Sequence, residues 1–384
     1  MFCPWAGLCH GLSAMAAAEG FWNELFGPAG GQGAAVHLRL LRKQGQPFLA
    51  LPARGRAAAA ALGLYPAQTG RARAARAVLR WLLLAGAAVG TESISLRVSP
   101  GDPFAEFLSS LAGAGRGAVP GFGILAGNPA SSGQRFIVLV FDARQRPVAV
   151  VKAGLSEPAR GLVRQEQSFL EAAAGQAGVP KLRGTFHSSR LEALALDYFA
   201  GEAPRPRDDW ALPALLWPWV EAKRTVSLCE APAWGRLERA AGGSPWWPLL
   251  AGRLRARALH PALAHGDLAP WNIKLSPQGH WRALDWERGE VTGIAGWDWF
   301  HYIIQRAILV ERRPTRELVG RVEGLLNSET FQRYAAHTGI RGCERELVLA
   351  YLLYAAEVIK PAEGLPQTRE LVSALAGALE TLKR

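Results

Sequence analysis

The stretch HGDLAPWNIKL, residues 265–275, contains residue types at a spacing that could support catalysis. Asp267 follows His265 by two residues, and Asn272 follows Asp267 by five residues. In this order the carboxylate can accept the proton of an attacking hydroxyl, while the amide holds a magnesium ion beside nucleotide phosphates. Apolar residues lie on both sides of the polar ones. The pattern therefore predicts phosphoryl transfer, and the alternative is a polar turn between two strands.

A lysine and a glutamate upstream could bind the phosphates of that nucleotide. Lys152 ends the apolar segment PVAVVK in a chain that has 37 Arg and only 7 Lys. Its compact ammonium can reach the α- and β-phosphates, where a planar guanidinium would fit differently. Glu166 lies fourteen residues later in a predicted helix over 157–174 and can hold this lysine in place. Glu171 is the second candidate for that role, and the alternative for all three side chains is simple extension into solvent.

Two further segments could contact the nucleotide. Small residues between positions 123 and 133 predict a turn before a strand over 135–141, and backbone N–H groups there could approach phosphates without side-chain clashes. Downstream, a strand that starts at residue 191 runs into an exposed turn at Gly201, where backbone groups could meet the adenine ring. The candidate residues are Gly127, Ser131, Ser132 and Gly133 in the loop, and Asp197, Tyr198 and Phe199 in the second segment.

Another carboxylate follows the catalytic-loop pattern. Residues 281–284 predict a short strand that ends at Asp285, eighteen residues after Asp267 on the far side of a hairpin. That spacing allows Asn272 and Asp285 to bind the same magnesium ion. Asp298 opens an amphipathic helix, and we expect it to cap that helix or to brace a nearby loop.

The whole chain predicts three segments. Residues 1–115 are expected to alternate between strands and helices and contain no motif for chemistry, so a structural or partner-docking role is expected there. Residues 116–200 contain the nucleotide-binding candidates, and residues 201–384 are helical in pattern and rich in Trp. The N-terminal strands are predicted over 36–41, 47–51 and 93–98, the helices over 56–62, 71–88 and 103–111, and a linker over 112–121. The C-terminal helices are predicted over 316–327, 330–337, 344–359 and 367–382.

Composition excludes several classes of protein. The longest apolar run, residues 81–90, is much shorter than the about 20 residues that span a membrane. The net charge of +12 is spread along the chain without a dense basic tract, so nucleic-acid binding is not expected. Attraction to anionic small molecules explains this charge equally well. The four cysteines are scattered, and the N-terminus lacks the basic region of a signal peptide. We therefore expect a cytoplasmic protein, which starts at Met1 or Met15.

Taken together, the motifs resemble the aminoglycoside phosphotransferase and choline kinase family, a branch of the protein-kinase-like fold. HGDLAPWN and the downstream LDWE carry the resemblance, which covers about residues 120–384 with the motifs in the same order. It implies a two-lobed α+β fold, with a small antiparallel-sheet lobe and an α-rich lobe, here preceded by an extra N-terminal α/β region. It also implies a magnesium-dependent kinase that moves the γ-phosphoryl group of ATP or GTP to a hydroxyl.

The resemblance implies a role for each matched residue. Asp267 would be the catalytic base, with His265 packing the catalytic loop beside it. The other implied roles are Lys152 as phosphate clamp, Glu166 as its brace, and Asn272 and Asp285 as magnesium ligands.

Two positions depart from the protein kinases within this fold. Gly266 stands where protein kinases have an Arg that reads an activation-loop phosphate, and residues 286–287 are Trp-Glu in place of Phe-Gly. Both departures favour a metabolite kinase over a regulated protein kinase, which stays an alternative.

The acceptor is less well defined by the sequence. Residues 201–264 contain six acidic and nine basic residues with six Trp, whereas a site for a polycationic aminoglycoside needs many acidic groups. A neutral or anionic acceptor such as a sugar is therefore expected. The alternatives are an aminoglycoside or amino-alcohol kinase and a catalytically silent nucleotide-binding scaffold. The sequence leaves the oligomeric state open.

Overall fold

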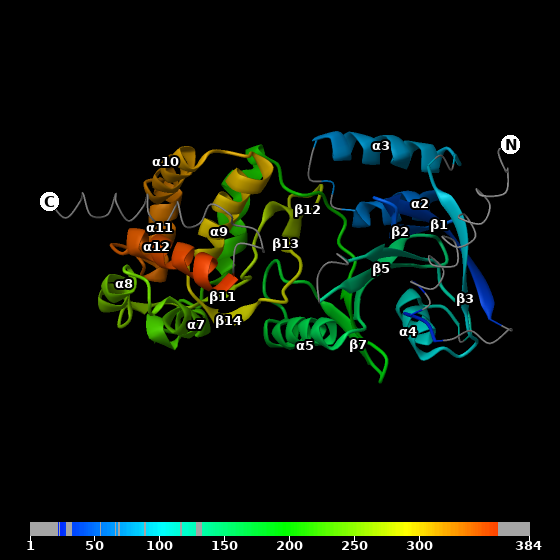
Figure 1. Cartoon of the computed structure of the whole chain (residues 1–384), viewed down its shortest axis with the longest axis horizontal. Coiled ribbons are helices and arrows are strands. Elements are labelled where there is room, and N and C mark those ends of the chain that lie inside the picture. Colours follow the sequence, from blue (N-terminus) through cyan, green and yellow to red (C-terminus); the bar gives the residue numbers. More distant parts are fainter. Residues whose placement is uncertain are drawn as a thin grey trace, which may run out of the picture. The chain divides into compact units, whose positions relative to one another are not determined.

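Segments of alternating apolar residues in the first half of the chain form an eight-stranded sheet in the order β3-β1-β2-β4-β5-β6-β8-β7 (Figure 1). Every pair of neighbouring strands in this sheet is antiparallel. The strands are β1 (Ala34–Lys43), β2 (Gln46–Pro52), β3 (Glu92–Val98), β4 (Phe122–Ala126), β5 (Arg135–Phe141), β6 (Pro147–Gly154), β7 (Leu182–His187) and β8 (Glu192–Asp197). The helices between them are α2 (Gly55–Ala61), α3 (Gly70–Leu84), α4 (Pro103–Ala112) and α5 (Glu157–Ala172).

The chain divides into two units. The first contains Met1–Gln167 and Lys181–Tyr198, and the second contains Ser168–Pro180 and Phe199–Arg384. The structure is a computed structural model that describes residues 22, 24–27, 33–53, 55–65, 67, 70–87, 90–115, 117–127 and 133–359. The predicted helix over 367–382 lies outside the described residues.

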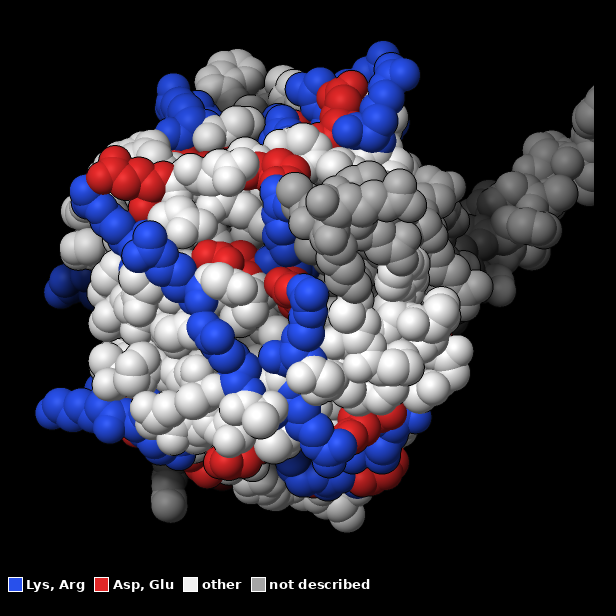
Figure 2. Space-filling model, turned by 90° about the vertical axis from the view of Figure 1, so that its left-hand side faces the viewer, with Lys and Arg blue, Asp and Glu red and all other residues white. Residues whose placement is uncertain are grey.

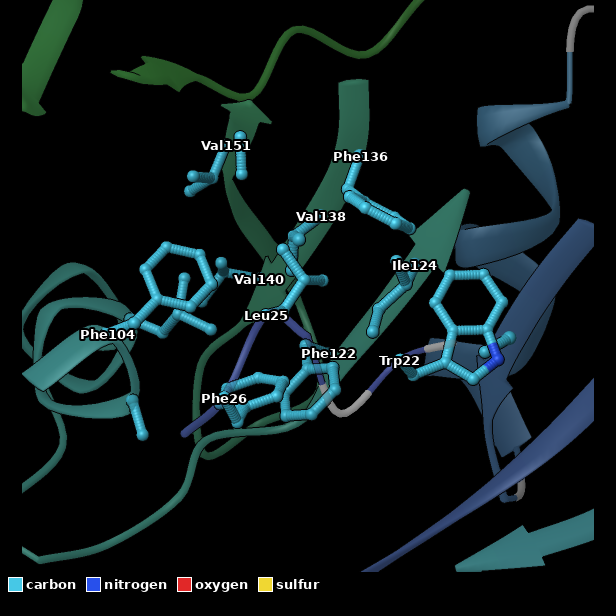
Figure 3. Packing of buried hydrophobic residues seen from close by; sticks show 14 of the residues in the cluster. Trp22, Leu25, Phe26, Phe104, Phe122, Ile124, Phe136, Val138, Val140 and Val151 are labelled. Carbon is cyan, nitrogen blue, oxygen red and sulfur yellow. The ribbon is translucent and has the colours of Figure 1, made fainter. Parts of the chain in front are cut away.

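Each face of the sheet is covered by its own apolar cluster, because successive side chains of a strand point to opposite faces. On β5, Val138 and Val140 belong to one cluster, while Leu139 and Phe141 belong to the other. The first cluster contains residues of α4 and aromatic side chains from near the N-terminus (Figure 3). In this cluster the ring of Phe26 lies 5.4 Å from that of Phe122. The second cluster contains residues of α2 and α3.

The N-terminal strands are part of the same sheet as the strands that follow. β2 pairs with both β1 and β4, so the sheet runs without interruption across the predicted linker over 112–121. Helix α4 ends at the start of this stretch, and its C-cap is Gly113, whose positive φ of 67° suits a residue without a side chain. The division into segments 1–115, 116–200 and 201–384 stays a prediction.

The second unit is mostly helical. Its helices are α6 (Leu212–Leu216), α7 (Pro232–Ala241), α8 (Trp247–Leu254), α9 (Trp297–Gln305), α10 (Thr315–Leu326), α11 (Glu329–Thr338) and α12 (Glu344–Tyr354). Short strands form three two-stranded sheets: β9 (Val226–Ser227) with β10 (Ala258–Leu259), β11 (Ala262–Ala264) with β14 (Glu290–Gly293), and β12 (Ile273–Leu275) with β13 (Trp281–Ala283). An antiparallel sheet in one unit and helices in the other confirm the predicted α+β fold class.

One prediction about the strands was wrong. Residues 123–133 were expected to form a turn, but their first part belongs to β4, which pairs with β2 and β5. Phe122 and Ile124 are buried in the core, and this burial outweighs the turn tendency of the small residues around them. The predicted strands over 36–41, 47–51, 93–98 and 135–141 and the predicted helices over 56–62, 71–88, 103–111 and 157–174 are confirmed within a few residues.

The packing of the first cluster predicts a large difference between two Trp substitutions. Trp22 is 0% exposed and packs edge-to-face on Phe136, whereas Trp210 is 82% exposed. We expect Trp22→Ala to lower the free energy of unfolding by about 3–5 kcal/mol and Trp210→Ala to change it by less than about 0.5 kcal/mol. Chemical denaturation followed by circular dichroism measures both. Equal effects of the two substitutions would show that Trp22 does not pack as described.

Candidate active site

The carboxylate of Asp267 is held from both sides by hydrogen bonds. Asn272 donates from Nδ2 to Oδ2 of Asp267 at 2.9 Å and also to the main-chain oxygen of Asp267 at 2.9 Å. Nε2 of His301 lies 3.1 Å from Oδ1. The side chain of Asp267 is still 32% exposed, so an acceptor hydroxyl can reach it. Both carboxylate oxygens are therefore oriented while each keeps a lone pair for a further proton donor.

Neighbouring side chains lower the pKa of Asp267. Burial alone would raise the pKa of its carboxyl, but the hydrogen bond from His301 and electrostatic interactions with His301, His265 and Arg288 hold that pKa below its ordinary value. A carboxylate at neutral pH can orient a hydroxyl and accept its proton as the hydroxyl attacks.

The backbone of the catalytic loop is held by a second, buried carboxylate. Asp298 lies in the first turn of α9 and accepts N–H of His265 through Oδ2 at 2.6 Å and N–H of Gly266 through Oδ1 at 3.0 Å. Burial raises the pKa of Asp298, and the nearby His265 and the two N–H groups oppose that rise. Of the two predicted roles for Asp298, the structure shows the loop brace, because the cap position of α9 is Gly296.

His265 connects this loop to the segment before Asp285. Its ring is buried, packs against Trp286, and lies with Nε2 2.7 Å from the main-chain oxygen of Leu284. Nδ1 accepts the N–H of Asp267 at 3.2 Å. Because a carbonyl only accepts, Nε2 carries the hydrogen, and the imidazole is oriented to brace the loop.

Asn272 and Asp285 lie at the same end of the β12–β13 hairpin. Ile273 pairs with Ala283, and the N–H of Leu284 donates to the main-chain oxygen of Asn272 at 2.7 Å. Asp285 follows directly and has a positive φ of 70°, an uncommon backbone conformation for a residue other than Gly.

These two residues fit a magnesium ion. Both amide hydrogens of Asn272 point to oxygens of Asp267, so its Oδ1 is the amide atom left for a cation. Magnesium takes oxygen ligands and usually binds one or two carboxylates together with phosphate oxygens and water. Among the described residues, no cluster of three or more His, Cys, Asp or Glu side chains could hold a metal by itself.

The predicted lysine–glutamate pair forms in the first unit. Nζ of Lys152 on β6 lies 2.7 Å from both carboxylate oxygens of Glu166 on α5, and both side chains are buried. Nη1 of Arg135 lies 3.9 Å from Oε2 of the same glutamate. Glu171, the second candidate, is exposed. The structure thus selects Glu166 as the partner of Lys152.

The phosphate-loop candidates are described only in part. A Cβ at Gly127 would lie 2.5 Å from the main-chain oxygen of Arg135. Only Gly therefore fits at this position, which directly follows the end of β4. Gly133 lies two residues before β5. Ser131 and Ser132 lie outside the described residues.

Of the three adenine-contact candidates, two have their N–H groups engaged in the sheet region. The N–H of Asp197 donates to the oxygen of Lys181 at 3.1 Å, and that of Tyr198 donates to the oxygen of Val148 at 3.3 Å. Among the described residues, the N–H of Phe199 makes no such backbone hydrogen bond. A contact between adenine and Asp197, Tyr198 or Phe199 stays a prediction.

His301 and Tyr351 were missed in the sequence. Tyr351 Oη lies 2.8 Å from Nδ1 of His301, which in turn contacts Asp267. His301 follows Asp298 by three residues, so both lie on one face of α9, and this spacing could have revealed it. No local signal connects Tyr351 to the site, because it lies fifty residues further along the chain.

Comparison with known proteins finds similarity only at the level of structure. No model of a protein family matches the sequence, and no curated protein matches it. A protein assigned as a fructosamine-3-kinase from Haemophilus somnus is 14% identical, with a TM-score of 0.42 over 71% of this chain and 96% of its own. An aminoglycoside phosphotransferase from Streptomyces rimosus is 14% identical, with a TM-score of 0.38 over 60% of this chain and 91% of its own.

A third similar structure is an aminoglycoside phosphotransferase in complex with ADP and hygromycin B. It is 12% identical, with a TM-score of 0.37 over 71% of this chain and 97% of its own. Two of the three structures are described as aminoglycoside phosphotransferases.

Charged side chains on the surface do not form a single basic patch on the face shown in Figure 2. Lys and Arg side chains there are spread out and interleaved with Asp and Glu. In the second unit, ion pairs join Arg333 to Glu329 and Arg253 to Glu346. In the described part of the chain, no helix is long and apolar enough to cross a membrane.

Two glycines with similar backbones test the close contact at the catalytic loop. Gly266 has φ +75° and a Cβ there would lie 2.9 Å from Cβ and O of Arg288, whereas Gly279 has φ +83° and open space around it. Each Gly→Ala substitution places a side chain at positive φ, which costs about 1–2 kcal/mol. We expect Gly266→Ala to lower the free energy of unfolding by about 1–3 kcal/mol more than Gly279→Ala, as measured by chemical denaturation. An equal loss would argue against the contact with Arg288.

Proposed function

We propose that this protein is a small-molecule kinase that transfers the γ-phosphoryl group of ATP to a hydroxyl of its acceptor. The observation that carries this proposal is the ionised, partly exposed carboxylate of Asp267, which Asn272 and His301 hold by both oxygens. A fixed carboxylate beside an amide with a free oxygen is the arrangement that phosphoryl transfer requires. GTP in place of ATP is the alternative nucleotide.

In the proposed reaction Asp267 orients the acceptor hydroxyl and takes its proton. The acceptor oxygen forms the new bond to the γ-phosphorus, and the bond from that phosphorus to the β–γ bridging oxygen breaks. The electron pair of that bond leaves with ADP. Because phosphoryl transfer needs little covalent chemistry from the protein, positioning and charge neutralisation supply most of the rate enhancement.

The other site residues would bind the nucleotide. Lys152, held by Glu166, would contact the phosphate oxygens, and the N–H of Phe199 would contact adenine. Asn272 and Asp285 would hold magnesium, which when bound neutralises phosphate charge.

We further propose that the acceptor is neutral or anionic, as a sugar or a related compound would be. The charge of Arg288 contributes to the lowered pKa of Asp267, so a cationic side chain lies in the neighbourhood of the proposed base. A polycationic aminoglycoside would be repelled there. Residues 201–264 also have more basic than acidic residues. A cytoplasmic location fits a substrate such as ATP and belongs to the same proposal.

Substitution of the base tests the reaction directly. We expect acceptor-stimulated release of ADP to require Mg²⁺, to stop with EDTA, and to fall by about 10²–10⁴-fold in kcat for Asp267→Asn, because the amide cannot accept the proton. The measurement is ADP release over a panel of sugars, amino alcohols and aminoglycosides. Failure of the wild type to bind Mg²⁺–ATP in calorimetry would overturn the kinase proposal, and phosphorylation of aminoglycosides would overturn the acceptor class.

Two glutamates on α5 provide a matched test of the phosphate clamp. Glu166 is buried on Lys152, whereas Glu171 is exposed. We expect Glu166→Gln to raise KM for ATP about tenfold or more, because a charged hydrogen bond to the lysine contributes about 1.5–3 kcal/mol. Glu171→Gln should leave KM unchanged. Steady-state kinetics with varied ATP measures both, and the same KM in both variants would contradict the clamp.

A further inference from the structure

We infer that His301, backed by Tyr351, is a positioning residue that sets the orientation of the Asp267 carboxylate. This inference rests on the proposed function, since it concerns the base of that reaction. His301 does not face the reacting atoms itself; it acts through Asp267.

The three side chains form a continuous chain of hydrogen bonds. Nε2 of His301 lies 3.1 Å from Oδ1 of Asp267, and Nδ1 of His301 lies 2.8 Å from Oη of Tyr351. His301 and Tyr351 are each 2% exposed, so water does not compete for these contacts. They come from α9 and α12, so helix packing fixes the imidazole from both sides.

The hydrogen-bond partners decide which ring nitrogen carries the proton. A carboxylate only accepts, so Nε2 of His301 must donate to Asp267. Burial and the negative charges of Asp267 and Asp298 raise the pKa of Tyr351 well above its usual range, which keeps its hydroxyl protonated. The hydroxyl can then donate to Nδ1, so the chain runs from Tyr351 through His301 to Asp267 with every donor facing an acceptor.

This arrangement restricts the one torsion of Asp267 that matters for catalysis. The torsion that rotates a carboxylate is broad and nearly free in the absence of partners. Asn272 fixes Oδ2, and His301 fixes Oδ1, so the remaining lone pairs point in defined directions. Removal of the His301 contact leaves only one oxygen fixed, and a small misplacement of a catalytic group can lower a rate about 10²-fold.

The test compares three substitutions under saturating ATP and acceptor. We expect His301→Leu to lower kcat about 10²-fold while KM for ATP and for acceptor changes less than about threefold. His301→Gln retains an N–H donor of similar reach, so its kcat should be at least tenfold higher than that of His301→Leu. Tyr351→Phe removes only the hydroxyl and should lower kcat by a smaller factor. The unfolding midpoint of each variant checks that it is folded.

A second arm separates this inference from the proposed function. In the Asp267→Asn background His301→Leu should add no further loss, because both substitutions remove the same unit. Nitrogen-15 spectra of labelled histidine in the wild type should show His301 with its hydrogen on Nε2, a result that needs no turnover.

The outcomes lead to different conclusions. If Asp267→Asn keeps full turnover, or if the wild type has none, the proposed function fails, and the spectra alone then decide whether the hydrogen-bond chain exists. If Asp267→Asn loses activity but His301→Leu retains wild-type kcat, the positioning role is wrong. If His301→Gln is as inactive as His301→Leu, or if losses in the double variant add, His301 is only structural. A spectrum with the hydrogen on Nδ1 would also overturn the inference.

Discussion

The buried carboxylate of Asp298 is the constraint on which the candidate site depends. An ionisable group inside a protein is costly unless hydrogen bonds satisfy it, and here two consecutive N–H groups of the catalytic loop do so. The same helix, α9, carries His301 three residues later, and His301 contacts the side chain of Asp267. One helix therefore contacts both the backbone of the loop and the side chain of Asp267. A loop, which is usually mobile, could in this way hold the proposed base with the accuracy that catalysis needs.

Leu284 links the loop to the predicted metal ligands through its main chain. Its C=O accepts from His265, and its N–H donates to Asn272. Because Asp285 is the next residue, its position is determined by the same two hydrogen bonds. The loop, the hairpin and α9 thus form one connected unit, in which a shift of one part would displace Asp267, Asn272 and Asp285 together.

The first unit contains a buried ion pair, which Lys152 forms with Glu166. Lys152 and Glu166 are both buried, and removal of two charges from water costs several kcal/mol per ion, so such a pair adds little to stability. Its presence is easier to explain by function than by folding. The sheet that carries Lys152 extends to β1, β2 and β3, outside the region that resembles the kinase family. Leu38 of β1, Ile94 of β3 and Val151 of β6 belong to one core, so the N-terminal strands share a core with the strand that carries Lys152.

The sequence alone determined the features that depend on short distances along the chain. Period-two and helical patterns located most strands and helices within a few residues. The spacing of His265, Asp267 and Asn272 predicts a catalytic loop, which stays a proposal. The spacing from Lys152 to Glu166 also predicted a pair that the structure contains. The predictions of the strands, the helices and the lysine–glutamate pair succeeded because propensity and hydrogen-bonding geometry act over a few residues and are visible in the local pattern.

Only the tertiary structure decided the features that depend on contacts between distant segments. Burial of Phe122 and Ile124 converted part of a predicted turn into β4, and the sheet joined the N-terminal strands to the rest. The choice of Glu166 over Glu171 followed from which glutamate faces β6. His301 and Tyr351 entered the site because α9 and α12 place them there, although each is an ordinary helix residue in its local sequence. Packing determines which side chains meet, and no pattern within one segment contains that information.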